Sequence, residues 1–146
     1  MRKPIILLFL FLVMSGCGDD LAPLDAVVTG PEDSTFTVAK GSPGETFLFT
    51  LDFQVKNLAG DALPEVEIEF IASGGTLTDL DGNVLNLVDP FFFKTLTDDR
   101  GLGRVSFLTT LPACSATADQ TVTGLVTASV GVDNDQWEGT FTVPTC

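Results

Sequence analysis

Oxygen-bearing side chains gather between residues 79 and 89 with the spacing of part of a calcium loop. They are Asp79, Asp81, Asn83 and Asp89. Calcium takes about six to eight oxygen ligands, and a complete loop ends with a bidentate Glu about twelve positions in. That position is Pro90 here, and Asp81-Gly82 is also an ordinary turn pair. Two interpretations stay open: a plain turn, or a Ca²⁺- or glycan-binding loop. The run Asp133-Asn134-Asp135 admits the same choice between turn and metal.

Catalytic chemistry has few side chains to use in this chain. The sequence contains no histidine and no tyrosine. Ser-His-Asp and Cys-His arrangements and imidazole-bound metals are therefore excluded. The remaining candidates are the carboxylates Asp98, Asp99, Glu65, Glu67 and Glu69. A glycosidase needs two carboxyls about 5–9 Å apart across a cleft, and a solvated strand face provides no cleft. We expect a protein that is not an enzyme and needs no cofactor.

The start of the chain has the pattern of an export signal. Arg2 and Lys3 precede an unbroken apolar run over residues 5–14, which is shorter than the about 20 residues that span a bilayer. The segment Val13-Met14-Ser15-Gly16-Cys17 resembles the lipobox of bacterial lipoproteins. The resemblance implies that residues 1–16 are removed and that Cys17 carries a lipid that anchors the protein to a membrane. Because Gly18 rather than Asp follows, it also implies the outer membrane.

Charge and composition restrict the partners of the mature chain. Loss of Arg2 and Lys3 changes the net charge from −13 to −15. Binding to phosphate backbones needs clustered Lys and Arg, so no nucleic-acid partner is expected. Residues 17–32 have little periodic pattern and are predicted to be a tether, although residues 25–29 could instead form a first edge strand. Residues 33–146 are predicted to be one domain.

Alternation of apolar and polar side chains, which is typical of β-strands, dominates from Ser34 onward. In the clearest segment, Val66, Ile68 and Phe70 alternate with three glutamates. The other predicted strands cover residues 34–38, 47–55, 104–109, 122–130 and 137–143. Clusters of Gly, Pro, Asn and Asp separate them and favour turns. Together these features predict an all-β sandwich with phenylalanines and Trp137 packed between two sheets.

The cysteines are odd in number, and lipid on Cys17 would leave Cys114 and Cys146 as a pair. If the last two predicted strands form a hairpin, Cys114 and Cys146 fall at the same end of the sandwich. A separation of about 5.5 Å between their Cα atoms is then plausible. A structural disulfide is the leading interpretation; intermolecular pairing, free thiols or a metal are the alternatives.

The run Phe91-Phe92-Phe93 interrupts the alternation. In a strand, Phe92 must point away from the face that Phe91 and Phe93 share. One face of the run is then exposed unless another segment covers it. The three phenylalanines are the candidate partner-binding patch of the chain, and burial of all three is the alternative.

Several short motifs resemble bacterial Ig-like domains of the invasin and intimin type. Residues 55–66 resemble the strand–turn–strand motif, with Pro64 and Val66 at the start of the second strand. Further matches lie at residues 73–77, 97–105, 126–130 and 139–143. The resemblance implies an Ig-like antiparallel β-sandwich of about seven strands with an adhesive or stacking role and no catalytic residues. We therefore expect a membrane-anchored, exported interaction module of the cell envelope whose partner is another envelope or surface protein.

The lipobox resemblance makes the first testable prediction. Wild-type protein in its host is expected in the membrane fraction and labelled by a fatty-acid probe. Cys17→Ser removes the thiol that accepts the lipid, so the variant should stay unlabelled. Equal labelling of wild type and variant would contradict lipid attachment at Cys17.

Overall fold

The structure is a computed structural model that describes residues 22–146. The predicted signal peptide, Cys17 and the first part of the predicted tether lie outside the described residues. The described part of the chain contains nine strands, and no helix in it is long and apolar enough to cross a membrane. The strands are β1 (Val27–Thr29), β2 (Ser34–Thr37), β3 (Glu45–Lys56), β4 (Glu67–Ser73), β5 (Thr76–Thr78), β6 (Phe92–Leu96), β7 (Leu102–Leu111), β8 (Gln120–Val130) and β9 (Asp133–Val143).

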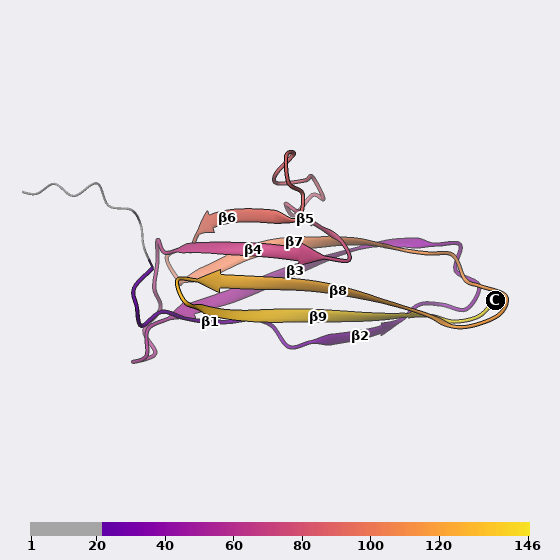
Figure 1. The fold of residues 1–146 in the computed structure, drawn as a ribbon, viewed down its shortest axis with the longest axis horizontal. Helices are drawn as coiled ribbons and strands as arrows, with labels where there is room; N and C mark the ends of the chain where they lie inside the picture. Colours follow the sequence, from indigo (N-terminus) through magenta and orange to yellow (C-terminus); the bar gives the residue numbers. More distant parts are fainter. Residues whose placement is uncertain (1–21) are drawn as a thin grey trace, which may run out of the picture.

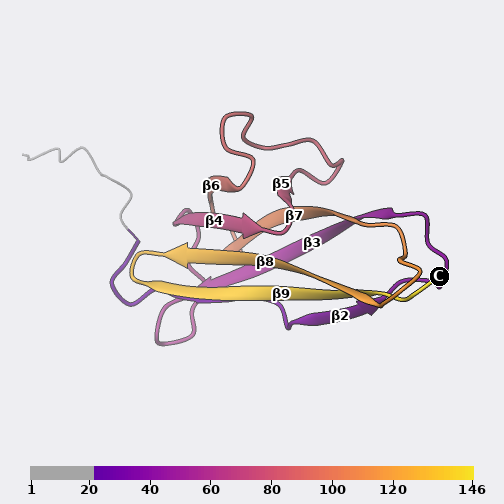
Figure 2. The same ribbon diagram turned by 45° about the vertical axis from the view of Figure 1, so that its right-hand side comes forward.

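Two sheets lie face to face, as Figures 1 and 2 show. One has the strand order β1-β3-β7-β5 and the other the order β2-β9-β8-β4-β6. Neighbouring strands are antiparallel except β2, which pairs with β9 in parallel. The predicted all-β sandwich is confirmed. It has nine strands rather than about seven, because short strands such as β1 and β5 extend the sheet edges.

The core forms from side chains that point inward from alternate positions of both sheets. In β9, buried and half-buried residues alternate from Trp137 to Val143. The ring of Phe107 lies edge-on to that of Trp137, with centroids 5.6 Å apart, and Phe53 lies edge-on to Phe70 at 5.5 Å. Burial of each such side chain stabilises the fold by about 1.5–3 kcal/mol relative to exposure. The predicted aromatic filling between the sheets is therefore present.

The segment predicted as the end of the tether belongs to the sandwich. Val27–Thr29 is strand β1 and pairs antiparallel with the last residues of β3. Ala26 and Val28 are buried, with 5% and 3% of their surface exposed. Of the edge-strand alternative for residues 25–29, Val27–Thr29 forms a strand, and the tether prediction is corrected over those residues. The chain then crosses to the other sheet, where it forms β2.

Two aspartates of β9 help to keep the three-residue strand β1 in the sandwich. The Oδ2 atom of Asp133 accepts a hydrogen bond from the Val28 N–H at 2.8 Å, and Oδ2 of Asp135 accepts one from the Gly30 N–H at 2.7 Å. These bonds satisfy backbone donors on the side of β1 that no strand covers. The run Asp133-Asn134-Asp135 thus ties one sheet to the edge of the other, which accounts for its carboxylates without a metal.

Strand β4 begins two residues later than the alternation predicts. Glu65 has a positive φ of 56° and lies in the turn before the strand. Glu67 and Glu69 point outward as predicted, and both contact the ammonium of Lys94 on β6. These contacts raise the pKa of Lys94, with Glu69 as the larger cause. The glutamates form a solvated, ion-paired face of the sheet.

Cys114 and Cys146 form the predicted disulfide at the end of the sandwich that carries the C-terminus (Figure 1). Their Cα atoms are 5.4 Å apart. Backbone hydrogen bonds hold both partners: Cys114 N donates to the Ser42 carbonyl at 3.0 Å, and Cys146 N to the Ser115 carbonyl at 2.9 Å. The disulfide therefore joins the loop before β8 to the segment after β9.

Removal of this disulfide is expected to destabilise the domain strongly. The bond closes a loop with a sequence separation of 32 residues. In the chain-entropy model this is worth about 3–4 kcal/mol, which is large beside a total of about 5–15 kcal/mol. Urea unfolding of the Cys114→Ala/Cys146→Ala variant should show that loss, and a thiol assay should find neither cysteine reactive in the native wild type. An unchanged unfolding midpoint would contradict the prediction.

Candidate functional site

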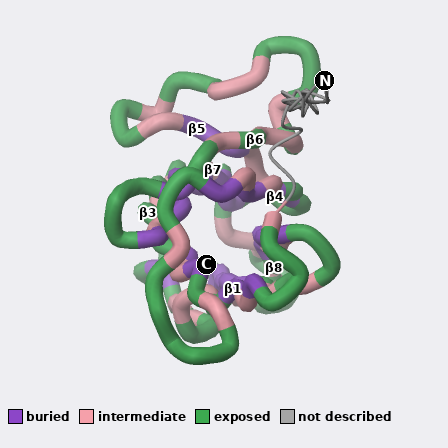
Figure 3. Tube along the Cα trace, turned by 90° about the vertical axis from the view of Figure 1, so that its left-hand side faces the viewer, coloured by how far each residue is buried: buried purple, intermediate pink, exposed green. Residues whose placement is uncertain are grey.

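The candidate site is the loop that joins β5 to β6, residues 79–91, together with the start of β6. This loop projects from one side of the sandwich in Figures 1 and 2, and most of it is exposed in Figure 3. Two backbone hydrogen bonds anchor it to β5: Leu77 N donates to the Pro90 carbonyl at 2.9 Å, and Leu85 N to the Leu77 carbonyl at 3.3 Å. The predicted calcium candidates and the three phenylalanines thus lie in one continuous segment.

The first half of the loop is a turn built around the carboxylate of Asp79. Its Oδ1 accepts hydrogen bonds from the backbone N–H groups of Asp81 and Asn83, each at 2.9 Å. Its Oδ2 accepts one from the Asn83 side-chain amide, also at 2.9 Å. Gly82 has a positive φ of 85°, which suits glycine. Asp79 therefore stabilises the turn with both of its oxygens.

The electrostatics of the turn favour the charged form of Asp79. Hydrogen bonds from the side chain of Asn83 and then from its backbone lower the pKa of the Asp79 carboxyl below its ordinary value of 3.8. Both carboxylate oxygens already accept hydrogen bonds within the turn. Within residues 22–146, no three His, Cys, Asp or Glu side chains are placed to share a metal ion. Of the two interpretations, the geometry fits the plain turn.

The second half of the loop is a further hydrogen-bonded turn, which sequence analysis did not predict. Asn86 Oδ1 accepts from the N–H groups of Val88 and Asp89 at 3.1 and 3.2 Å, and its Nδ2 donates to the Phe92 carbonyl at 3.2 Å. Asp89 Oδ1 accepts from the Phe91 N–H at 3.0 Å. Leu87 and Val88 lie at the tip, 90% and 96% exposed. Polar side chains thus hold two apolar ones out in solvent.

The three phenylalanines have three different environments. Phe93 points inward and packs against the core. Phe92 lies opposite Ile71 of β4, on the outer face, and is half-buried. Phe91 lies in the turn before β6 and is 48% exposed. The predicted opposition of Phe92 and Phe93 is therefore observed, whereas Phe91 precedes the strand.

The outer face of β4 and β6 extends the apolar surface beyond the loop. Ile71, opposite the half-buried Phe92, is 54% exposed, and Leu96 at the end of β6 is 50% exposed. Lys94 lies between Phe92 and Leu96 on β6 and pairs with the two glutamates of β4. Charged side chains thus divide this face, so the loop tip and Phe91 form the more concentrated apolar surface.

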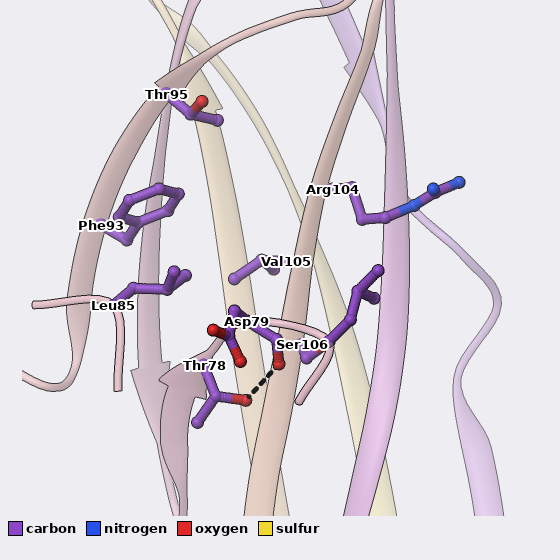
Figure 4. A pocket seen from close by; sticks show the side chains of 9 residues that line it. Thr78, Asp79, Leu85, Phe93, Thr95, Arg104, Val105 and Ser106 are labelled. Carbon is purple, nitrogen blue, oxygen red and sulfur yellow. Dashed lines mark hydrogen bonds between the residues drawn. The ribbon is translucent and has the colours of Figure 1, made fainter. Parts of the chain in front are cut away.

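A cavity of about 250 Å³ lies under the loop, where the open edges of the two sheets meet. Phe93, Leu85 and Val105 line it in Figure 4, together with the hydroxyl-bearing Thr78 and Thr95. The Thr78 hydroxyl donates to the Asp79 carbonyl at 3.1 Å. In Figure 4 the guanidinium of Arg104 points away from this space, and it pairs with Asp52.

The chemistry of this cavity is that of an apolar pocket. Among the described residues that line it, the one carboxylate belongs to Asp79, whose oxygens are bound within the turn. Elsewhere, the Asp98 carboxylate accepts hydrogen bonds from the N–H groups of Leu102 and Arg100 at 2.9 and 2.8 Å, and these bonds, that from Leu102 most, lower its pKa. Asp98 is thus a turn residue. The arrangement can bind apolar groups, and no catalytic pair is assembled around it.

Comparison with known proteins gives only distant likenesses. No protein-family model matches the sequence, and no curated protein matches it. Among solved structures, AggA, the major subunit of aggregative adherence fimbriae type I from Escherichia coli, matches with a TM-score of 0.47 and 10% identity over 86% of this chain and 99% of that chain. A conjugative transposon lipoprotein from Bacteroides eggerthii matches with a TM-score of 0.38 and 13% identity, over 83% of this chain and 98% of that chain.

The Asp79 turn predicts a pH dependence of the loop. Because the folded-state pKa of Asp79 lies below 3.8, its contribution is present above the ordinary carboxyl pKa and is lost as the pH falls through the lowered one. The amide proton shift of Asn83, followed by NMR, should titrate with a midpoint below 3.8. Asp79→Asn should abolish this titration, and Asp81→Asn should preserve it. A midpoint at or above the ordinary value would contradict the assignment.

Proposed function

We propose that this chain is a lipid-anchored, non-enzymatic interaction module of the bacterial cell envelope, and that the β5–β6 loop is its binding site for another envelope or surface protein. The observation that carries the proposal is the tip of this loop. Leu87 and Val88 are almost completely exposed, and the Asn86 and Asp89 side chains fix the backbone around them. Apolar side chains presented in this way are typical of interaction sites.

The rigidity of the loop favours binding. Hydrogen bonds to Asp79 and Asn86 restrain its two halves, and the Leu77–Pro90 bond anchors its end. A loop that is already ordered loses less conformational entropy when a partner binds. Phe91, beside the tip, adds an aromatic side chain of the kind that contributes most at protein interfaces.

Location follows from the sequence pattern at the start of the chain. The lipobox resemblance implies a lipid on Cys17, and Gly18 after it supports the outer membrane. With Ala26 already in the sandwich, the eight residues 18–25 connect the lipid to the domain, and the chain between them can reach at most about 30 Å. The module would then act close to the membrane surface. Its acidic surface, at a net charge of −13 before processing, favours partners with basic surfaces.

The test compares two pairs of exposed apolar residues in intact cells. Leu87→Ser/Val88→Ser removes the loop tip, whereas Leu58→Ser/Val132→Ser changes residues that are 79% and 84% exposed in other turns. Both variants should keep the unfolding free energy within about 1 kcal/mol, as surface substitutions do. Crosslinking followed by mass spectrometry should recover a partner protein with wild type and with the control, but not with the loop variant.

A second arm asks whether the site extends onto the sheet. Phe92→Ser replaces a half-buried ring on the outer face, and loss of the partner without loss of the fold would include it in the site. Recovery of the same partner with Leu87→Ser/Val88→Ser as with wild type would contradict the proposal.

A further inference from the structure

Strand β3 has an uncovered edge over most of its length. It pairs with β7 from Glu45 to Gln54, but β1 covers its other side only from Gln54 to Lys56. The chain that follows β1 crosses to the other sheet as β2, so no strand of the described chain lies beside residues 45–53 of β3. This open stretch is about 30 Å long.

Hydrogen bonding to β7 fixes which residues face the open edge. Val55 N donates to the Gly101 carbonyl at 2.8 Å, so Val55 and every second residue before it bond toward β7. The even-numbered residues of β3 direct their N–H and C=O groups away from β7, and the last two of them, Gln54 and Lys56, pair with β1. The four that remain are Thr46, Leu48, Thr50 and Asp52. In the described chain their backbone groups bond to no other residue.

The side chains of these residues hold the strand in place without covering its edge. The Thr46 hydroxyl lies 3.1 Å from that of Thr110, and Asp52 accepts from the Arg104 guanidinium at 2.9 Å. Both contacts reach across to β7. The edge is therefore rigid and ready to pair, which lowers the entropy cost of adding a strand.

The sheet edges at β1, at β5 and at the start of β6 carry some protection. Asp133 and Asp135 cap β1, and the β5–β6 loop covers Leu77 of β5 and Phe92 of β6. Proteins usually blunt an open edge with Lys, Pro or a bulge. Residues 45–53 contain no Lys and no Pro, their register with β7 is continuous, and residues 46–51 carry no charge.

We propose that this edge pairs with the same edge of a second copy of the chain, antiparallel, about a two-fold axis at Phe49. In this register Thr46 lies opposite Asp52 of the second copy and Leu48 opposite Thr50, so all four unpaired residues find partners. Moving the axis to Thr50 would place Thr46 opposite Gln54, whose edge β1 already occupies. The backbone therefore selects one self-complementary register, and the two four-stranded sheets become one continuous sheet.

Side chains around the axis also suit a second copy. The rings of Phe47 and Phe49 are half-buried behind the edge, and Phe36 lies 4.8 Å from Phe49 between ring centroids. Pairing brings the two Phe49 residues directly opposite each other and covers these rings. Glu45 faces Phe53 and Asp52 faces Thr46, so no two carboxylates of this stretch meet despite the acidic chain.

The oligomeric state of the full chain in detergent micelles tests the proposal. Sedimentation velocity should show a dimer. Leu48→Pro and Thr50→Pro each remove an N–H that β7 does not use, so each dimer loses two hydrogen bonds and its dissociation constant should rise about tenfold or more. Leu96→Pro is the matched control, since it removes an outward N–H from the other sheet's edge at β6, and should stay dimeric. Far-UV circular dichroism checks that all variants remain folded.

Crosslinking distinguishes the register. Leu48→Cys chains mixed with Thr50→Cys chains should form mixed disulfides on oxidation, because these positions face each other. Thr46→Cys mixed with Thr50→Cys should not. A monomeric wild type would overturn the proposal, whether or not it pairs with a different protein. A dimer that forms equally well in both proline variants would also overturn it.

Discussion

Contact between Trp137 and Phe107 at the centre of the sandwich depends on the absence of two side chains. Gly124 and Gly139 face each other on β8 and β9. A Cβ atom on Gly139 would lie 2.5 Å from the indole of Trp137, and one on Gly124 would lie 2.6 Å from the ring of Phe107. Either contact would force a ring out of its present position. The packing of these two rings between the layers therefore depends on glycine at both positions.

The edge strands of the two sheets differ in how their outward N–H and C=O groups find hydrogen-bond partners. Carboxylates of β9 cap β1, and a long hydrogen-bonded loop covers the edges of β5 and β6. The same loop displays Leu87 and Val88. One segment thus covers an edge and presents an apolar tip, whereas within residues 22–146 no segment covers β3 over residues 45–53. The two proposed binding surfaces are therefore at different edges and can be tested independently.

Alternation predicted the long strands well, because each presents several apolar residues to one core. The disulfide followed from the hairpin of β8 and β9, which the same alternation revealed. The short strands β1 and β5 were harder to predict, because an alternation of apolar and polar residues cannot be recognised over three residues. The loop tip at Leu87 and Val88 was not predicted. The spacing of Asn86 and Asp89 around it was the available indication of a turn.

The run of three phenylalanines shows how the pleat links the core to the candidate site. Consecutive strand residues point to opposite faces, so a strand cannot bury Phe92 and Phe93 on the same side. Phe93 is packed in the core and lines the cavity, which fixes where β6 begins. Phe92 is then placed on the outer face, and its carbonyl accepts the hydrogen bond from Asn86 that closes the loop. Core packing at Phe93 therefore determines where Leu87 and Val88 are presented.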